Sequence, residues 1–154
     1  MKIRAEIQKS LYNQYFNRDK HWSYQLERCG ILVGKKISDE YFLITEIIED
    51  VNPISQSPFG VFRSTEHIYP KLIESIEQNP DSDYLGEWHT HPNGPNSASF
   101  IDILSMRSMI NNPIYGDIEW AILLIIIKYQ REILYYFDKK GFEIIKLEKK
   151  TTII

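Results

Sequence analysis

The sequence predicts a single domain of the α/β (α+β) class, with a mixed β-sheet flanked by two or three helices. Segments typical of strands alternate with segments typical of helices, and three strands follow one another at the end. At 154 residues the chain has the length of one domain and can bury a sizeable core. Hydrophobic residues make up 43% and aromatic residues 13%, which excludes a disordered chain. We therefore expect residues 1–154 to form one domain.

The first part of the chain predicts one weak helix and two strands. Leu11, Tyr15 and Tyr12 would form the apolar face of that helix. A short apolar run bracketed by glycines and a run of aromatic and β-branched residues are typical of strands. A stretch rich in proline and serine follows them. The predicted segments are a helix at 11–16, strands at 30–34 and 41–48, and a loop or irregular strand at 52–63.

A second helix is predicted from Ser64 or Thr65 to the Asn-Pro-Asp stop at 79–81, because Ile68, Leu72, Ile73 and Ile76 recur at helical spacing. Pro70 falls inside this pattern, so we expect the regular helix to begin near it. The next predicted segments are a strand at 84–91, ended by Pro92, and a loop at 92–98.

The last third predicts one helix and three strands. The helix begins at Ser99 and ends near Ile110, and its inner face would comprise Ile103, Met106, Met109 and Ile110. The longest apolar run, 120–127, is typical of a central strand that is buried on both faces. The predicted strands are 118–128, 132–138 and 142–147, the last two joined by a turn at 139–141.

Charge and cysteine content narrow the class of protein. Eighteen Lys and Arg against 21 Asp and Glu give a formal charge of −3, which argues against nucleic acid as a partner. Cys29 is the only cysteine, so no intramolecular disulfide can form. The first residues are charged where a signal peptide is apolar, and the run 120–127 is too short to span a bilayer. We expect a cytoplasmic protein with no membrane partner.

His89 and His91 are the strongest indication of chemistry. One residue separates them on the predicted strand 84–91, so both side chains project to the same face. Asp102 follows at the start of the next predicted helix and can bring a carboxylate to them. Zinc accepts two imidazoles and one carboxylate, and this set leaves the fourth tetrahedral position for water, as in catalytic sites.

Ordinary structural roles are the alternative for these and similar residues. Ser99 with an acidic residue three positions later, Asp102, is close to a capping box and needs no active site. A cap and a metal site are compatible, because the cap would hold Asp102 in the first helical turn. We interpret His21 and His67 as ordinary surface or core residues. Cys29 is interpreted as a buried, inert thiol rather than a nucleophile.

The complete pattern resembles the motif of the JAMM (MPN+) zinc metalloproteases. In this sequence, His89-Thr-His91 is followed after seven residues by Ser99 and after two more residues by Asp102. The pattern arises by accident on the order of once in 10⁴ chains of this length. Residues 84–92, Tyr-Leu-Gly-Glu-Trp-His-Thr-His-Pro, look most like the bacterial Prok-JAB branch, and residues 27–34, Glu-Arg-Cys-Gly-Ile-Leu-Val-Gly, resemble the strand that carries the family's catalytic glutamate. The similarity covers most of the chain and implies an MPN/JAB-like domain with a curved sheet.

The resemblance implies a role for each residue of the motif. His89, His91 and Asp102 would bind Zn²⁺, and Glu27 would act as the general base. Ser99 would donate a hydrogen bond to the developing oxyanion. These roles agree with metal-assisted hydrolysis, in which a carboxylate takes the proton of water and returns it to the leaving amine.

Glu87 is the main alternative to Glu27. Strand alternation puts Glu87 on the face of the two histidines, where it could act as the base or orient a ligand imidazole. Trp88 and Thr90 would then point to the opposite side and pack. The other acids available are Glu46, Glu49 and Asp50.

As an activity, the resemblance implies a zinc-dependent isopeptidase or peptidase, deubiquitinase-like in chemistry. Its substrate would be a ubiquitin-like modifier, or a conjugated C-terminal tail, linked to a target protein. Similar bacterial members occur beside E1/E2-like enzymes. Some belong to anti-phage (antiviral defence) operons, where they undo the conjugation of a nucleotide cyclase, and others lie in mobile elements. Ala98 stands immediately before Ser99, where many bacterial relatives have proline.

Two further function classes stay open at this stage. The first is a non-enzymatic scaffold or binding module of the same fold; such members are expected to have lost ligands, whereas all five motif positions are filled here. The second is a metal hydrolase similar to the DNA-repair-associated JAB branch. The acidic charge and the lack of an accompanying helical DNA-binding segment argue against it.

Overall fold

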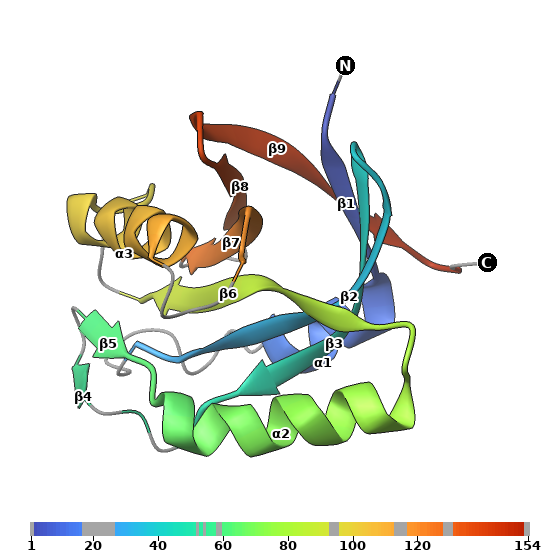
Figure 1. The fold of residues 1–154 in the computed structure, drawn as a ribbon, viewed down its shortest axis with the longest axis horizontal. Coiled ribbons are helices and arrows are strands. Elements are labelled where there is room, and N and C mark those ends of the chain that lie inside the picture. The colour runs from blue at the N-terminus through green and yellow to red at the C-terminus, as the bar shows by residue number, and fades with distance from the viewer. Residues whose placement is uncertain are drawn as a thin grey trace.

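A computed structural model describes residues 2–16, 27–51, 53, 55–57, 60–92, 96–112, 117–127 and 131–152. Strands dominate these residues, and three helices lie around them (Figure 1). The strands are β1 (Arg4–Gln8), β2 (Cys29–Ser38), β3 (Tyr41–Glu49), β4 (Ser55–Ser57), β5 (Gly60–Phe62), β6 (Asp83–His91), β7 (Trp120–Ile127), β8 (Arg131–Asp138) and β9 (Gly141–Lys150). The helices are α1 (Lys9–Phe16), α2 (Thr65–Gln78) and α3 (Phe100–Asn111).

The main sheet is mixed, as predicted, and its curvature closes it into a barrel. The strand order is β1-β3-β2-β6-β7-β8-β9, and β9 returns to pair with β1. The pairs β1–β3, β1–β9 and β6–β7 are parallel, and the other neighbours are antiparallel. β1, the strand that closes the barrel, was not predicted from the sequence. Closure leaves this sheet without a free edge.

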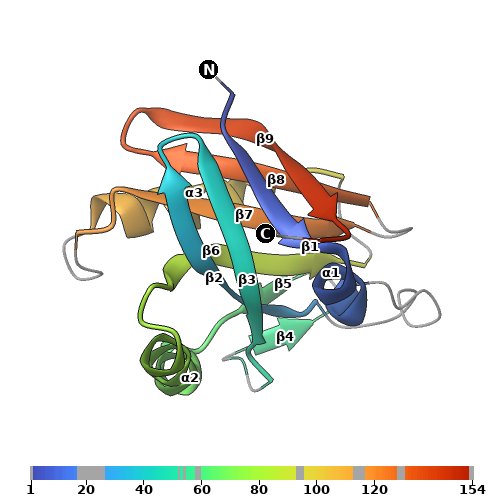
Figure 2. The same ribbon diagram turned by 90° about the vertical axis from the view of Figure 1, so that its right-hand side faces the viewer.

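The interior of the barrel is the largest hydrophobic core. Trp88, Phe42, Leu32 and Ile122 are fully buried there, because every second residue of a strand faces inward. Figure 2 shows α1 at one end of the barrel, below β1. The predicted apolar face of this helix is confirmed in part: Tyr12 is buried, and Leu11 and Tyr15 are partly buried against the same core. The prediction omitted Phe16, which is buried one turn from Tyr12. Phe16 reaches the barrel core, with its ring edge-on to that of Trp88 at 5.2 Å.

β7 is buried on both faces, as its continuous apolar sequence predicts. Ile122, Leu124 and Ile126 face the barrel interior, and the alternate residues form a second core under α3. The predicted inner face of α3 is confirmed, with Met106, Met109 and Ile110 buried and Ile103 partly buried in this second core. Figure 1 shows α3 on one side of β6 and α2 on the other, so β6 crosses the space between the two helices.

α2 begins at Thr65, as its sequence predicts, and it is regular through Pro70, which corrects the expectation that the regular part begins near that residue. Pro70 lies within the helix and has no backbone N–H to donate. Two contacts hold the turn before it: Ile68 is buried against β2 and β3, and the backbone N–H of Ser64 donates to the carboxylate of Asp50 at 2.6 Å. These tertiary contacts outweigh the loss of one helical hydrogen bond.

Element boundaries elsewhere differ by a few residues from the prediction. The described part of 52–63 contains a short hairpin of β4 and β5, and β2 and β9 are longer than expected. His21 lies outside the described residues. Among the described residues, none of the helices is both long and apolar enough to cross a membrane.

Candidate metal centre

β6 positions the two histidines of the candidate site. It lies between β2 and β7 in the barrel wall, so its backbone is held on both sides. Trp88 and Thr90 face away from the histidines, as expected: Trp88 lies in the barrel core and donates to the carbonyl of Ile48 at 3.1 Å. The Nε2 atoms of His89 and His91 lie 3.0 Å apart.

The first turn of α3 brings a carboxylate to the same point. Ser99 is the N-cap, its Oγ accepting from the backbone N–H of Asp102 at 3.1 Å, and the backbone N–H of Ser99 donates to Asp102 Oδ2 at 2.8 Å. The predicted capping box is therefore present. Asp102 Oδ2 lies 3.3 Å from Nε2 of His89 and 3.4 Å from Nε2 of His91. The cap thus fixes the oxygen that meets both imidazoles.

The separations of these three atoms fit the ligand set of a zinc ion. Ligands about 2.0–2.1 Å from a tetrahedral zinc are separated from one another by roughly 3.3–3.4 Å. The two imidazole–carboxylate separations match this ligand–ligand distance, and the imidazole–imidazole separation of 3.0 Å is slightly shorter. The side chains of His91, His89 and Asp102 are 4%, 12% and 18% exposed, so the centre is largely shielded from solvent. Nitrogen and carboxylate donors of this kind suit Zn²⁺.

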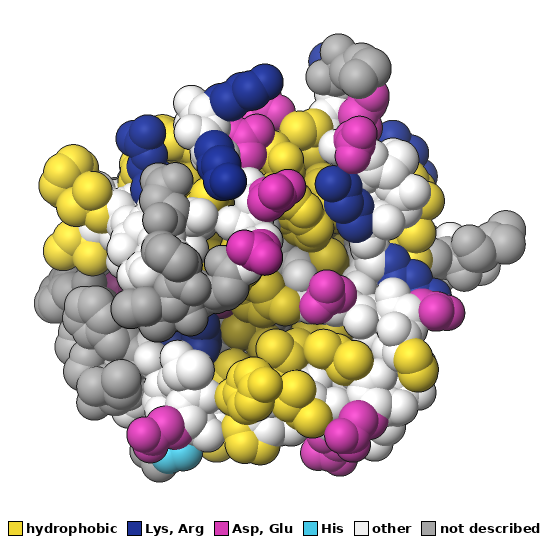
Figure 3. Space-filling model, in the orientation of Figure 1, with side chains coloured by type: hydrophobic (Ala, Val, Ile, Leu, Met, Phe, Trp, Pro, Cys, Tyr) yellow, Lys and Arg dark blue, Asp and Glu magenta, His cyan; other side chains and the backbone are white. Residues whose placement is uncertain are grey.

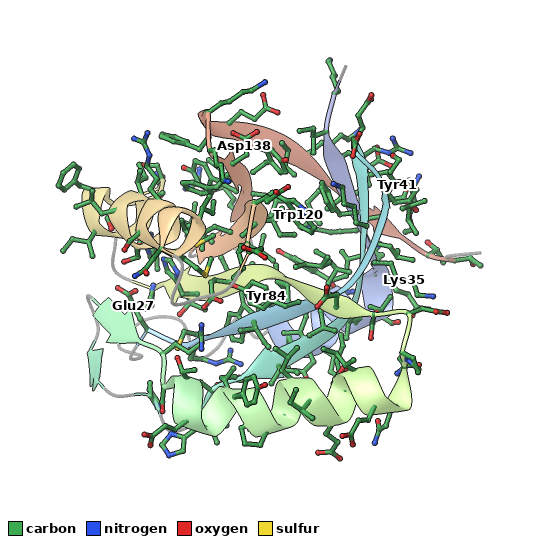
Figure 4. All side chains as sticks on the ribbon, in the orientation of Figure 1. Glu27, Lys35, Tyr41, Tyr84, Trp120 and Asp138 are labelled. Atoms are coloured by element: carbon green, nitrogen blue, oxygen red, sulfur yellow. The ribbon has the colours of Figure 1, made fainter. Side chains whose placement is uncertain are left out.

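Glu27 lies beside the histidines although it is 62 residues away in sequence. Its carboxylate and the ring nitrogens of His89 and His91 all lie within 4.8 Å of one another. The pairing of β2 with β6 brings it there: Thr90 N–H donates to the carbonyl of Arg28, and Arg28 N–H donates to Thr90 Oγ1. Figure 4 shows Glu27 at the end of β6 that carries the histidines.

Burial alters the acidity of both carboxyl groups. Burial raises the pKa of Glu27, and the charge of Asp102 adds to this, while His89 and His91 act in the opposite direction. For Asp102, burial also acts to raise the pKa, but hydrogen bonds from His89, His91 and the Ser99 N–H outweigh it and hold the pKa well below its usual range. The pKa of Glu27 is thus shifted up and that of Asp102 down, so the two neighbouring carboxyl groups differ in basicity.

Glu87 makes its hydrogen bonds away from the imidazoles of His89 and His91, which corrects the idea that it orients one of them. Its carboxylate accepts from Arg63 Nε at 2.5 Å and from the hydroxyl of Tyr84. The predicted strand face is correct, since Glu87 lies on the outer side of β6. Arg63 and Tyr84 were not among the residues predicted for the site. Arg63 falls in a stretch without a periodic pattern, and only the fold places it next to Glu87.

Cys29 is buried, as the sequence analysis expected. The thiol is 5% exposed, and burial raises its pKa from an ordinary value of 9.0 to about 12, with the charges of Asp50 and Glu87 adding to this. A thiol of this acidity is almost entirely protonated at neutral pH. It therefore does not offer a nucleophile.

Known proteins resemble this chain in sequence and in fold. The chain is 35% identical over 89 residues to a protein named "CD-NTase/cGAS isopeptidase" from Escherichia coli (strain TW11681). This match covers 57% of the chain and 56% of the relative, so the chain spans little more than half of that protein's length. The solution structure of protein DSY2949 from Desulfitobacterium hafniense has a similar fold, with a TM-score of 0.67 over 97% of this chain and 94% of that one, at 17% identity.

The family is identified by a match over most of the chain. The profile described as "Prokaryotic homologs of the JAB domain" matches residues 9–136. These limits contain Glu27, both histidines, Ser99 and Asp102. The chain belongs to the family of prokaryotic homologs of the JAB domain.

Proposed function

We propose that this protein is a zinc-dependent isopeptidase or peptidase. The observation that carries the proposal is the convergence of His89 Nε2, His91 Nε2 and Asp102 Oδ2, which are 3.0–3.4 Å apart. The carboxylate of Glu27 beside them supports hydrolysis rather than a purely structural site. A structural zinc usually has four protein ligands, whereas a catalytic zinc has three and keeps one position for water or substrate.

His89, His91 and Asp102 would hold the ion, and Glu27 and Ser99 would act on the substrate. A bound zinc would supply a Lewis acid that lowers the pKa of water and polarises the scissile carbonyl. Glu27 would take a proton from the attacking water and pass it to the leaving amine, a role favoured by its raised pKa. The Ser99 Oγ accepts its cap bond from Asp102, so its own O–H is left to donate to the oxyanion.

The proposed substrate is a protein conjugate with an isopeptide bond, either to a ubiquitin-like modifier or through a conjugated C-terminal tail. The name of the E. coli relative, "CD-NTase/cGAS isopeptidase", supports this class. By that likeness, the proposed partners are a nucleotide cyclase and the E1/E2-like enzymes that would conjugate it. The proposed setting is anti-phage defence.

The first test is the zinc content of the purified chain after reconstitution with ZnCl₂. We expect about one zinc per chain in the wild type and a loss in His89→Ala, because removing one of three ligands leaves too few donors. His67→Ala is the matched control, since His67 is exposed on α2, outside the candidate metal centre. Elemental analysis after gel filtration measures the ratio.

A wild-type chain without zinc after reconstitution would contradict the proposal. The scaffold or binding-module hypothesis would then be favoured, and Ser99 and Asp102 would be explained by the helix cap alone. Equal zinc in wild type and His89→Ala would place the metal elsewhere. Cleavage of DNA without cleavage of any conjugate would instead favour the DNA-repair-associated hydrolase.

A further inference from the structure

The first turn of α3 must lie at one place on the barrel for the candidate metal centre to form. Asp102 Oδ2 is 3.3 and 3.4 Å from the two imidazole Nε2 atoms, and a displacement of about 1 Å is enough to disrupt a site of this kind. The capping box joins Asp102 to Ser99, so it orients the carboxylate within the helix. It does not by itself place the helix on the barrel.

Apolar packing holds the later turns of α3 more firmly than the first. Met106 and Met109 are buried in the second core under α3, whereas Phe100 and Ile101 are exposed. Ile103 is partly buried against that core. Figure 3, in the orientation of Figure 1, shows hydrophobic side chains at the surface on the left edge, where α3 begins. The outer side of the first turn therefore faces solvent.

Tyr135 on β8 makes a hydrogen bond to the residue before the N-cap. The backbone N–H of Ala98 donates to the hydroxyl oxygen of Tyr135 at 2.9 Å. Among the hydrogen bonds of the described residues 96–101, this is the one that joins them to an element other than α3. Ala98 also packs against the second core. The chain is thus attached to the barrel wall one residue before Ser99.

The side chain of Tyr135 is held in a fixed place. β8 lies between β7 and β9 in the barrel wall, so its backbone is paired on both sides. Tyr135 is buried, and the rings of Phe137 and Phe142 lie 6.2 and 6.1 Å from its ring, within the range of aromatic contacts. The hydroxyl group can therefore define where Ala98 lies.

We infer that Tyr135 is a positioning residue of the candidate metal centre. Its hydroxyl fixes the start of α3 so that Asp102 meets the imidazoles of His89 and His91. The effect passes through the backbone of Ala98, and proline at this position could not make the bond, because it has no N–H. The inference rests on the proposed function, since it concerns the ligands of the same site.

Hydrogen exchange of the zinc-free protein, followed by NMR, tests the contact itself. Tyr135→Phe keeps the ring and removes the hydroxyl, so the amide of Ala98 should exchange about ten-fold faster than in the wild type. Exchange at Met109 should stay unchanged, because the second core is intact. Tyr136→Phe is the matched control. Tyr136 is the next residue of β8, packs against the barrel core instead, and makes no hydrogen bond with a described residue.

Metal binding tests the consequence for the site. In competition with a chromophoric chelator, Tyr135→Phe should bind zinc about ten-fold more weakly than the wild type, and Tyr136→Phe should stay within about two-fold of it. Co²⁺ in place of zinc gives a second readout, because its visible absorption depends on the geometry of its ligands. The Co²⁺ spectrum should change in Tyr135→Phe and not in Tyr136→Phe.

Three results would overturn the inference. The first is unchanged exchange at Ala98 in Tyr135→Phe. The second is faster exchange there with wild-type zinc affinity and an unchanged Co²⁺ spectrum, which would leave Tyr135 a purely structural role. The third is equally faster exchange at Met109, which would attribute weaker zinc binding to a general loosening of the fold.

These results are distinct from a failure of the proposed function. A wild-type chain that binds neither Zn²⁺ nor Co²⁺ would contradict the proposed function, and the inference with it. Metal binding that is the same in the wild type and in Tyr135→Phe would contradict the inference alone.

Discussion

Glu27 differs from every other acid near the candidate centre in combining burial with a position beside the imidazoles. It is 4% exposed, and its raised pKa makes it a stronger base than an exposed glutamate. Glu87 is held between Arg63 and Tyr84, so both of its carboxylate oxygens are already engaged by groups other than the imidazoles. The two candidates for the base are therefore separated by their contacts, and a substitution can test the choice.

We predict that Glu27→Gln keeps the metal and loses hydrolysis. The amide has the same shape but cannot accept the proton, so the rate should fall by about 10²–10⁴-fold. Zinc content and the cleavage of a fluorogenic isopeptide measure the two properties separately. Glu87→Gln is the control and should cleave. Loss of zinc in Glu27→Gln would make Glu27 a ligand, and normal cleavage would exclude it as the base.

Ser99 has two roles in this structure that different substitutions separate. Ser99→Ala should lower the free energy of unfolding by about 1 kcal/mol because the cap of α3 is lost, whereas Ser99→Gly should lower it by only a few tenths. Both remove the hydroxyl, so both should slow hydrolysis by about 10²-fold. Urea unfolding and cleavage assays on the two variants provide the comparison. Full activity in Ser99→Gly would reduce Ser99 to a helix cap.

At the scale of elements, the site depends on how closely β6 approaches its neighbours. Gly86 has no side chain, and a Cβ there would overlap the backbone carbonyl oxygen of Ile122 on β7. A Cβ on Gly30 would meet the backbone of β3 and the indole nitrogen of Trp88, 2.6 Å away. The strand that carries the histidines, β6, and the strand that follows Glu27, β2, are thus packed against their neighbours too tightly for side chains at these points.

We predict that Gly86→Ala lowers the free energy of unfolding by more than about 3 kcal/mol, because backbone atoms of β7 must move to admit the methyl group. Lys146→Ala on β9 is the control, since its side chain is 75% exposed, and it should change stability by less than about 0.5 kcal/mol. Urea unfolding followed by tryptophan fluorescence measures both. Wild-type stability of Gly86→Ala would show that β6 and β7 are further apart than described.

At the scale of the whole molecule, several titratable groups are buried in their neutral forms. Burial raises the pKa of Cys29 from 9.0 to about 12. Burial is also the largest cause that raises the pKa of Tyr12 and of Tyr84, with Glu132 and Glu87 respectively adding to it. A group whose pKa is higher in the folded than in the unfolded state stabilises the fold below its unfolded pKa. That contribution is lost as the pH rises toward its folded pKa.

We therefore predict that the free energy of unfolding falls between pH 8 and pH 10.5. Cys29 alone contributes about 2 kcal/mol to the fall, since one pKa unit corresponds to about 1.4 kcal/mol. Urea titrations at the two pH values measure it. Cys29→Ala should lose less stability over this interval than the wild type, whatever its stability at pH 8. Equal losses in the two proteins would contradict the raised pKa of Cys29.

Local patterns in the sequence were sufficient to predict much of this protein. The alternation that puts His89 and His91 on one face, the cap formed by Ser99 and Asp102, and the apolar run of β7 all depend on residues close together in the chain. The resemblance of the motif pointed to the family that the comparison identified. These features follow from backbone geometry and side-chain spacing that neighbouring residues determine.

Only the tertiary structure decided how distant segments meet. The pairing of β2 with β6 brings Glu27 to the histidines, and the fold directs Glu87 to Arg63 and Tyr84 instead of an imidazole. Closure by β1, the buried face of α1 and a helix that continues through Pro70 also depend on long-range contacts. The free energy of such contacts comes from surfaces that meet only in the folded chain, so no local pattern records it.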